Sequence, residues 1–502
     1  MSQCPEYYAD NHGVDLTDFF ASGRSVSDLR DLLARAVVVE KPKEPEISPN
    51  VQRFMRGRKF LPARLAQAIM QDLEVVADPE TGLIYRWEGR YWSQYDLSYI
   101  RQRALQMLGE DGTSSKAADV ANMIRDLSVL PPGRAMNDRT DMICLESGMF
   151  DLSCGDLGRH DRDFFATHML PIDFDPENIA DCPTWKRCLE QWMGDDETIR
   201  EAQKFAGYCL TRETRYEKML ILYGPGGDGK STFMNVLRAL IGPENCSHVP
   251  MGKLEEQFYL SRLVDKLINM STEVEQRAMQ SMEIKAIVSG DPISAAFKNQ
   301  DPFDFTPFCK LVYSTNRLPK MLDNSDGFFR KILLIEFSGQ FVKRGEADIF
   351  LMDKLIEELP GIFAWALAGL VMLREEGFTE SDAMQKSLSD YKRINNNVLY
   401  YIEQHVEIDP AGKAIKSEVY EDYAKRCRAW NLMPLGEPQF RLEFLRLLRE
   451  RDCDVRDGKA YDESQVRRNA YTGLRLVDEK LTDDDLPPTP PSPRSDHSEV
   501  SQ

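Results

Sequence analysis

The stretch MLILYGPGGDGKSTFMNVLRAL, residues 219–240, decides the fold of the central part of this chain. Positions 224–231 match the phosphate-binding loop pattern G-x-x-x-x-G-K-S/T at every specified position. The apolar run Met219–Tyr223 before the loop is typical of a buried strand, and residues 232–240 after it have the spacing of a helix. A strand, a glycine-rich loop and a helix in this order predict an α/β core that binds a nucleoside triphosphate.

The residue types within the loop indicate how it would hold the phosphates. Glycines have no Cβ, so backbone N–H groups can approach the phosphate oxygens, and the start of the following helix adds a favourable dipole. The lysine neutralises the β and γ phosphates, and the next hydroxyl is a ligand of Mg²⁺. We therefore predict ATP and Mg²⁺ as cofactors, with these nucleotide-binding residues: Gly224, Pro225, Gly226, Gly227, Asp228, Gly229, Lys230, Ser231 and Thr232.

A second apolar run, at residues 266–273, ends in a carboxylate. An acid at this place can polarise the water that attacks the γ-phosphate, so Glu273 is the predicted catalytic base, with Glu275 as the alternative if the register shifts. Thr272 stands where an aspartate usually steadies magnesium. We therefore expect Mg²⁺ to be held by Ser231 and Glu273, partly through water.

Two more polar residues follow apolar strands. Asn316 comes after the run at 311–313, and its amide can orient the attacking water or sense the γ-phosphate; by itself, such an asparagine is more often a turn or capping residue. Arg330 precedes the run at 332–335, on a turn that suits an arginine finger acting in its own subunit or in a neighbour. The alternative for Arg330 is a surface ion pair.

Composition limits the partners. Lys and Arg number 63 against 82 Asp and Glu, so the net charge of -19 excludes a simple basic coat for nucleic acid and requires a local channel. The ten cysteines form no C-x-x-C pair, which favours reduced thiols over a metal site. Neither a signal segment nor a run of about 18 apolar residues is evident, so we expect no membrane contact and a cytoplasmic protein, in the host cytoplasm if a phage encodes it.

The chain is long enough for several domains, and five segments are expected. Residues 1–80 form a partly flexible N-terminal segment with a proline-rich linker, residues 81–210 a mostly helical domain with a hairpin about Glu88-Gly89, and residues 211–385 the ATPase core. Residues 386–478 form a winged-helix-like domain, and residues 479–502 an acidic, proline-rich tail that should be disordered.

The winged-helix expectation rests on the order helix, helix and β-ribbon, with helices at 418–430 and 438–451 and a hairpin around Asp457-Gly458. Arg441, Arg446 and Arg449 on the second helix can face phosphate. Acidic neighbours and the use of such modules for protein docking leave DNA and protein binding open.

Four elements together resemble the superfamily 3 helicase module of phage, plasmid and poxvirus primase-helicases. They are the phosphate-binding loop, the run Met-Ser-Thr-Glu at 270–273, the pair 289–294 and 301–305, and the pair 314–319 and 326–331. The resemblance covers about residues 85–477. It implies an AAA+ type core that assembles as a ring, usually a hexamer, and moves 3′ to 5′ on single-stranded DNA. It also implies that Glu273 activates water, Asn316 is the sensor and Arg330 serves the adjacent subunit.

Some positions depart from the family's usual pattern. Phe329 and Lys331 flank Arg330 where the family often has tryptophan and arginine, so Arg330 is the sole finger candidate. Residues 286–307 resemble the family's DNA-gripping hairpin, with its tip near 297–300, and Lys298 is the predicted DNA contact. The solvated-lysine alternative stays open because Gln300 replaces a basic residue that is frequent in the family.

These features predict an ATP-dependent DNA helicase, a hydrolase of phage, plasmid or viral DNA replication. The segment before Tyr85 is too short for a catalytic primase, so we expect no primer synthesis and, as partners, single-stranded DNA, further copies of the chain and a separate primase or polymerase. The alternative is a non-motor regulatory ATPase whose C-terminal domain binds a protein partner. A small-molecule kinase is disfavoured because the sensor and finger follow the acid strand in the order of ring ATPases.

Overall fold

The computed structural model describes residues 20–35, 49–57, 59–272, 282–298, 301–323, 325–339, 341, 348–429, 432–451, 453–461 and 466–477. The chain divides into two compact units. The first comprises Met1–Ile69 and Ile100–Ala121, and the second comprises Met70–Tyr99 and Asn122–Gln502.

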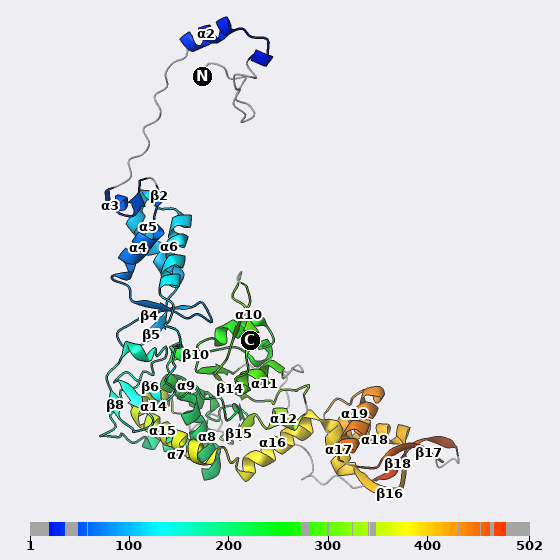
Figure 1. Cartoon of the computed structure of the whole chain (residues 1–502). Helices are drawn as coiled ribbons and strands as arrows, with labels where there is room; N and C mark the ends of the chain where they lie inside the picture. Colours follow the sequence, from blue (N-terminus) through cyan, green and yellow to red (C-terminus); the bar gives the residue numbers. More distant parts are fainter. Residues whose placement is uncertain are drawn as a thin grey trace, which may run out of the picture. The chain divides into compact units, whose positions relative to one another are not determined.

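The first unit is built mainly from helices (Figure 1). Helix α4 buries Leu65, Ala66 and Ile69, which share one face because Ile69 lies about one turn after the other two. Helix α5 contributes Ile100 and Ala104 to the buried residues. The elements that lie wholly or partly in this unit are α2 (Val26–Arg35), α3 (Pro49–Gln52), β1 (Met55–Arg56), β2 (Lys59–Phe60), α4 (Pro62–Met70), α5 (Leu97–Leu108) and α6 (Ser114–Leu127).

The second unit begins with two small antiparallel sheets and two helices. The expected hairpin about Glu88-Gly89 is confirmed, because β4 and β5 pair with Trp87 opposite Trp92. The other strands of these sheets are short and were not foreseen from the sequence. The elements are β3 (Val75–Ala77), β4 (Ile84–Trp87), β5 (Trp92–Gln94), β6 (Met142–Cys144), β7 (Met149–Asp151), β8 (Leu157–Gly158), α7 (Pro183–Met193) and α8 (Asp196–Cys209).

The central part of the second unit contains a five-stranded parallel sheet with the order β10-β11-β14-β9-β15. Four of its strands confirm the expected apolar runs; β10, only two residues long, was not expected. The strands are β9 (Met219–Tyr223), β10 (Cys246–Ser247), β11 (Ile268–Ser271), β14 (Lys310–Thr315) and β15 (Ile332–Glu336). The other elements are α9 (Lys230–Ile241), α10 (Gln257–Leu260), α11 (Met282–Ser289), β12 (Ile293–Ala295), β13 (Phe303–Phe305), α12 (Asp326–Phe329), α14 (Leu351–Glu357), α15 (Leu359–Glu376) and α16 (Asp382–Asn395).

Helices cover both faces of this sheet. Side chains alternate along β9, so Leu220 and Leu222 join the core formed with α7, α8, α9 and α15. Met219 and Ile221 join a second core, to which α10, α11 and α16 contribute. Burial on both faces explains why the strands are continuous apolar runs. The structure is thus a mixed α/β fold, consistent with a P-loop ATPase core.

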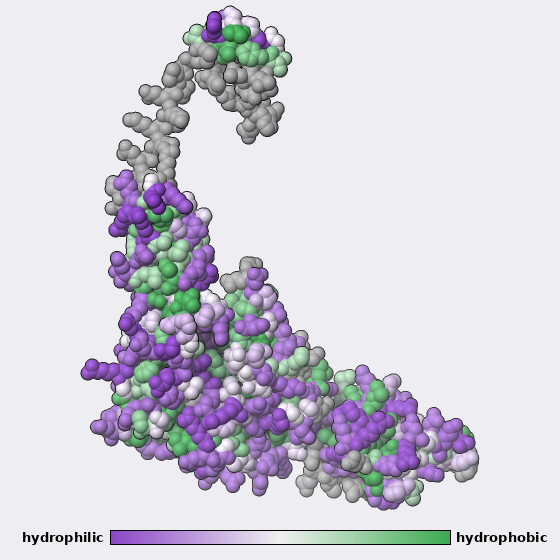
Figure 2. Space-filling view, in the orientation of Figure 1, coloured by the Kyte–Doolittle hydropathy of each residue, from purple (hydrophilic) through white to green (hydrophobic). Residues whose placement is uncertain are grey.

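The C-terminal part contains α17 (Asn397–His405), β16 (Val406–Ile415), α18 (Lys416–Ala429), α19 (Glu437–Glu450), β17 (Arg456–Tyr461) and β18 (Arg467–Leu476). The order helix, helix and β-ribbon is confirmed, and β16 adds a third strand. The turn expected at Asp457-Gly458 is wrong: both residues lie within β17, where Gly458 pairs with Ala470, and the connection falls at 462–465, outside the described residues. Figure 2 shows a mainly hydrophilic surface over this part.

Helices α8 and α15 pack against each other at very short distance. A Cβ on Gly207 would come within 2.4 Å of the Ala366 carbonyl oxygen, and one on Gly369 within 2.5 Å of the Gln203 carbonyl carbon. Only glycine permits this approach.

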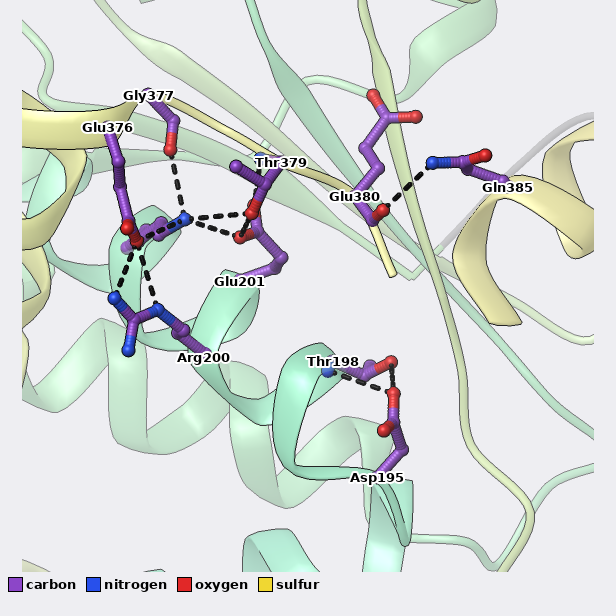
Figure 3. A network of polar contacts seen from close by, with 10 residues as sticks. Asp195, Thr198, Arg200, Glu201, Glu376, Gly377, Thr379, Glu380 and Gln385 are labelled. Carbon is purple, nitrogen blue, oxygen red and sulfur yellow. Dashed lines mark hydrogen bonds and ion pairs between the residues drawn. The ribbon is translucent and has the colours of Figure 1, made fainter. Parts of the chain in front are cut away.

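A polar network joins α8 to the end of α15 (Figure 3). The Lys204 ammonium, fully buried, contacts Glu201 at 2.6 Å, Glu376 at 2.8 Å and the Gly377 carbonyl at 2.9 Å. The Thr379 hydroxyl donates to Glu201 at 2.8 Å, so the carboxylate is satisfied as well. This buried network connects α8 to the chain that follows α15.

Among the described residues, no single helix is long and apolar enough to cross a membrane. Helices α14 and α15, which are bent by 70° relative to each other, reach that length and apolar composition only when they are taken together.

Candidate nucleotide-binding site

The phosphate-binding loop lies at the carboxyl edge of the parallel sheet. Strand β9 ends at Tyr223, which pairs with Thr315 of β14 on one side and with Glu336 of β15 on the other. The loop therefore leaves the sheet between the ends of two neighbouring strands, and α9 begins directly after it. In parallel α/β sheets this edge is where ligands bind.

Two glycines let the loop fold closely against its surroundings. A Cβ on Gly224 would lie 2.5 Å from the Phe337 carbonyl oxygen. Gly229 has a φ of 104°, and a Cβ there would lie 2.5 Å from the indole ring of Trp192. The contact with Trp192 was not foreseen, because that tryptophan comes from α7, far away in the sequence. Any larger residue at these positions would displace the loop.

Lys230 is held inside the loop. Its ammonium forms an ion pair with Asp228 and donates a hydrogen bond to the Gly224 carbonyl at 3.0 Å. The Gly226 N–H donates to the same carboxylate at 3.2 Å. Both side chains are buried, with 3% of Lys230 and 2% of Asp228 exposed. The loop thus folds around its own lysine, and Asp228 is the counter-ion.

Asn316 lies beside this loop. It follows β14 directly, and a turn in which the Arg317 N–H donates to the Thr315 hydroxyl at 3.1 Å shapes the backbone there. The Asn316 side chain is exposed, and its Nδ2 atom would be 3.5 Å from a Cβ on Gly226. The structure therefore brings the predicted sensor and the predicted phosphate-binding loop together.

Ser231 lines a hollow next to the loop. It is exposed in the first turn of α9, and Ser271 and Thr272, at the end of β11, line the same hollow. Hydroxyl oxygens suit Mg²⁺, which prefers oxygen ligands and keeps several waters. Glu273 lies outside the described residues, so its place in the site is not observed. The described donors thus fit a magnesium ion that a nucleotide and water mostly coordinate.

Arg330 lies at the amino ends of the strands, opposite the end at which the phosphate-binding loop lies. It directly follows α12 and precedes β15, whose first residue, Ile332, pairs with Met219 at the start of β9. The phosphate-binding loop follows the other end of β9, about 13 Å away at the usual rise per residue. The Arg330 side chain is exposed, whereas Lys331 is buried and contacts Glu217 and Ser289, each at 2.7 Å. The structure does not bring Arg330 to its own loop.

The expected hairpin between the acid and sensor strands is present. Strands β12 and β13 pair antiparallel, with Ala295 opposite Phe303, and the ring of Phe297 stacks on that of Phe303 at 4.9 Å. Lys298 is exposed next to this stack. Residues 299 and 300 lie outside the described part, and DNA contact by Lys298 stays a prediction.

The chain matches two family models. Residues 63–194 match a family described as D5 N terminal like. Residues 222–331 match a family of unknown function, DUF5906, and this match includes the phosphate-binding loop, the β12–β13 hairpin, Asn316 and Arg330.

Two curated relatives and one solved structure are similar to this chain. "Putative helicase L207/L206" of Acanthamoeba polyphaga mimivirus is 25% identical over 274 residues, which is 51% of this chain and 27% of the viral protein. "Uncharacterized mitochondrial protein ymf21" of Marchantia polymorpha is 21% identical over 126 residues, 23% of this chain and 70% of that protein. The apo structure of the NrS-1 C terminal region (A form) aligns with a TM-score of 0.49 and 12% identity, covering 82% of this chain and 100% of that one.

Proposed function

We propose that the chain is an ATP-dependent DNA helicase of phage, plasmid or viral replication, because residues 63–194 match the D5 N terminal like family and 274 residues are similar to a putative mimivirus helicase. The observation that carries the proposal is the position of Asn316 beside Gly226, at the edge where the phosphate-binding loop leaves the sheet. A sensor next to a phosphate-binding loop couples the state of a nucleotide to the rest of the fold.

Each residue of the site has a proposed part in ATP hydrolysis. Lys230, now paired with Asp228, would contact the β and γ phosphates, and the Ser231 hydroxyl would be a ligand of Mg²⁺, an ion that supplies charge neutralisation when bound. Asn316 orients the attacking water by accepting one hydrogen bond and donating another. Glu273 is the proposed base that takes the proton of this water.

We further propose that Arg330 acts on the nucleotide of a neighbouring subunit. It is exposed and lies across the sheet from its own phosphate-binding loop, so it cannot reach a nucleotide bound there. A head-to-tail contact between copies of the chain would bring Arg330 to the next loop, and such contacts generate closed rings. By its resemblance to superfamily 3 helicases we propose a ring of six copies, which would hold single-stranded DNA in its channel against Lys298.

The test of the proposed function is strand displacement by the full-length protein with ATP and Mg²⁺, together with the ATPase rate with and without single-stranded DNA. Lys230→Ala should abolish hydrolysis, because the variant lacks the ammonium that meets the phosphates. Lys186→Ala, an exposed lysine of α7, is the matched control and should keep the wild-type rate. If Lys230→Ala retains more than about a tenth of the rate, a loss below roughly 1.4 kcal/mol, the site assignment is wrong.

Mixing variants tests the ring. Neither Lys230→Ala nor Arg330→Ala should hydrolyse ATP alone, since each lacks one half of the shared site. Mixed rings should recover part of the activity, because some interfaces then pair an intact loop with an intact finger. Absence of recovery in mixed rings verified by mass photometry would show that Arg330 is not a finger in trans, and an active monomer would contradict the ring.

A further inference from the structure

The C-terminal part has a concentration of positive charge that contrasts with the charge of the whole chain, -19. Two adjoining hollows lie beside β17 and β18, and both are lined by Lys459 and Arg467. The acids that line them are Glu418 and Glu437. We call this region the basic surface, and its basic residues are Lys413, Lys416, Arg441, Lys459, Arg467 and Arg468.

The basic residues of this surface differ in the partners that they already have. Lys416 and Arg441 form ion pairs with Asp457, at 2.6 and 3.0 Å. Lys413, Lys459 and Arg467 are exposed, and none of the three forms an ion pair with a carboxylate in the part of the chain that the structure describes. These three cations are therefore available to an anionic partner.

An aromatic ring lies among these cations. Tyr461 is 66% exposed and is directly opposite Arg467 across the β17–β18 pair. Side chains opposite each other on paired strands lie close enough to act together on one ligand. A cation beside an exposed ring suits a nucleotide, because the cation meets the phosphate and the ring stacks on the base. An acidic protein would use the cations and would not need the ring.

Arg446 and Arg449 of α19 lie outside this surface. Arg446 already forms ion pairs with Glu443 and Glu450, both at 2.6 Å, and its contact with phosphate stays a prediction. Arg449 is exposed but lines neither hollow. The cations of the basic surface that form no ion pair in the described part of the chain, Lys413, Lys459 and Arg467, thus lie on strands β16, β17 and β18.

We propose that the basic surface binds single-stranded nucleic acid, with phosphates against Lys413, Lys459 and Arg467 and an unpaired base stacked on Tyr461. The inference rests on the proposed helicase function and gives the motor a second contact with the strand, apart from Lys298. It assigns the C-terminal part to nucleic acid and not to a protein partner.

The experiment measures the affinity of the full-length protein for a fluorescent oligo(dT), for a duplex of the same length and for both at several salt concentrations. Lys459→Gln/Arg467→Gln removes two phosphate contacts, so the slope of log K against log salt should fall by about 1.4 for the single strand. Tyr461→Ala should weaken binding roughly ten-fold through lost stacking. The matched control, Lys425→Gln/Arg449→Gln, removes two exposed cations of α18 and α19 and should change neither quantity.

The conservative variant Lys459→Arg/Arg467→Lys should bind as the wild type does, which separates charge from folding. Unchanged single-strand affinity and salt slope in Lys459→Gln/Arg467→Gln would overturn the proposal and leave protein docking as the use of this surface. A loss confined to the duplex would also overturn it. Because the variants keep the phosphate-binding loop, their ATPase rate without DNA should be unchanged; wild-type protein without DNA-stimulated hydrolysis would instead refute the helicase proposal.

Discussion

Asp228→Asn should increase the affinity for nucleotide and lower the folding stability of the nucleotide-free protein. The carboxylate of Asp228 holds the Lys230 ammonium, and phosphates need that same ammonium. Asparagine has nearly the same shape, and its oxygen can still accept the hydrogen bond that the Gly226 N–H donates at 3.2 Å. The change therefore removes one negative charge from the loop with little change in its geometry.

The size of the expected gain in ATP affinity follows from the repulsion between the Asp228 carboxylate and the phosphates. Two like unit charges about 5 Å apart repel by roughly 3 kcal/mol at an effective dielectric constant of about 20. Part of this repulsion is offset by Lys230, so we expect a gain of about 1.4 to 2.8 kcal/mol, or ten- to a hundred-fold in ATP affinity. Without nucleotide, the buried Lys230 loses its partner, and breaking a buried pair commonly costs about 3 kcal/mol or more of folding stability.

The assay combines calorimetric titration with ATP and thermal unfolding with and without ATP. The two quantities should move in opposite directions, with higher affinity and a lower melting temperature in the absence of ATP. Asp422→Asn, which removes an equal charge from the Arg426 pair in the C-terminal part, is the control and should leave ATP affinity unchanged. If Asp228→Asn binds ATP no better than the wild type, the carboxylate does not compete with phosphate.

Two further predictions concern buried lysines. Lys204→Met should destabilise the fold by about 3–5 kcal/mol in urea unfolding, because Glu201 stays buried without its cation. The double variant Lys204→Met/Glu201→Gln should recover part of this loss. An equal loss in Arg200→Met, whose side chain is 49% exposed, would contradict this reasoning. Burial lowers the pKa of Lys310 from 10.5 to about 7, so between these pH values the unfolded chain binds a proton that the folded chain does not. Stability should therefore rise with pH across this window, and Lys310→Met should reduce the rise in melting temperature; an unchanged pH profile would show that Lys310 is not its source.

The elements that the sequence predicted share one property. Strands β9, β11, β14 and β15 are buried on both faces, so each is an apolar run that needs no knowledge of its neighbours. Strand β17 shows where prediction from local sequence patterns fails. Asp457-Gly458 resembles a turn, but Gly458 lies in the strand, where a Cβ would come within 2.6 Å of the Thr472 side chain. Only the paired strand shows why glycine is there.

In the candidate site, too, local sequence predicts some features, whereas others depend on the packing of distant segments. The pattern at 224–231 identifies the loop because its chemistry depends on neighbours in sequence. The contact of Trp192 with Gly229 and the position of Arg330 across the sheet depend on the packing of distant segments, so no local pattern reveals them. The pairing of Asp228 with Lys230 is local, and an acid two residues before the lysine was the available signal. The basic surface escaped detection because its cations are spread over residues 413–468.

The strand order also has a consequence for synthesis of the chain. Strand β9 is made first, and its neighbours β14 and β15 are made roughly 90 and roughly 110 residues later; pairings of such long range form slowly. While the ribosome translates the intervening segment, the edges of β9 lack their partners, and its apolar side chains are available to other chains. Truncated products that end before β15 should therefore aggregate and depend on chaperones, even though they contain the complete phosphate-binding loop.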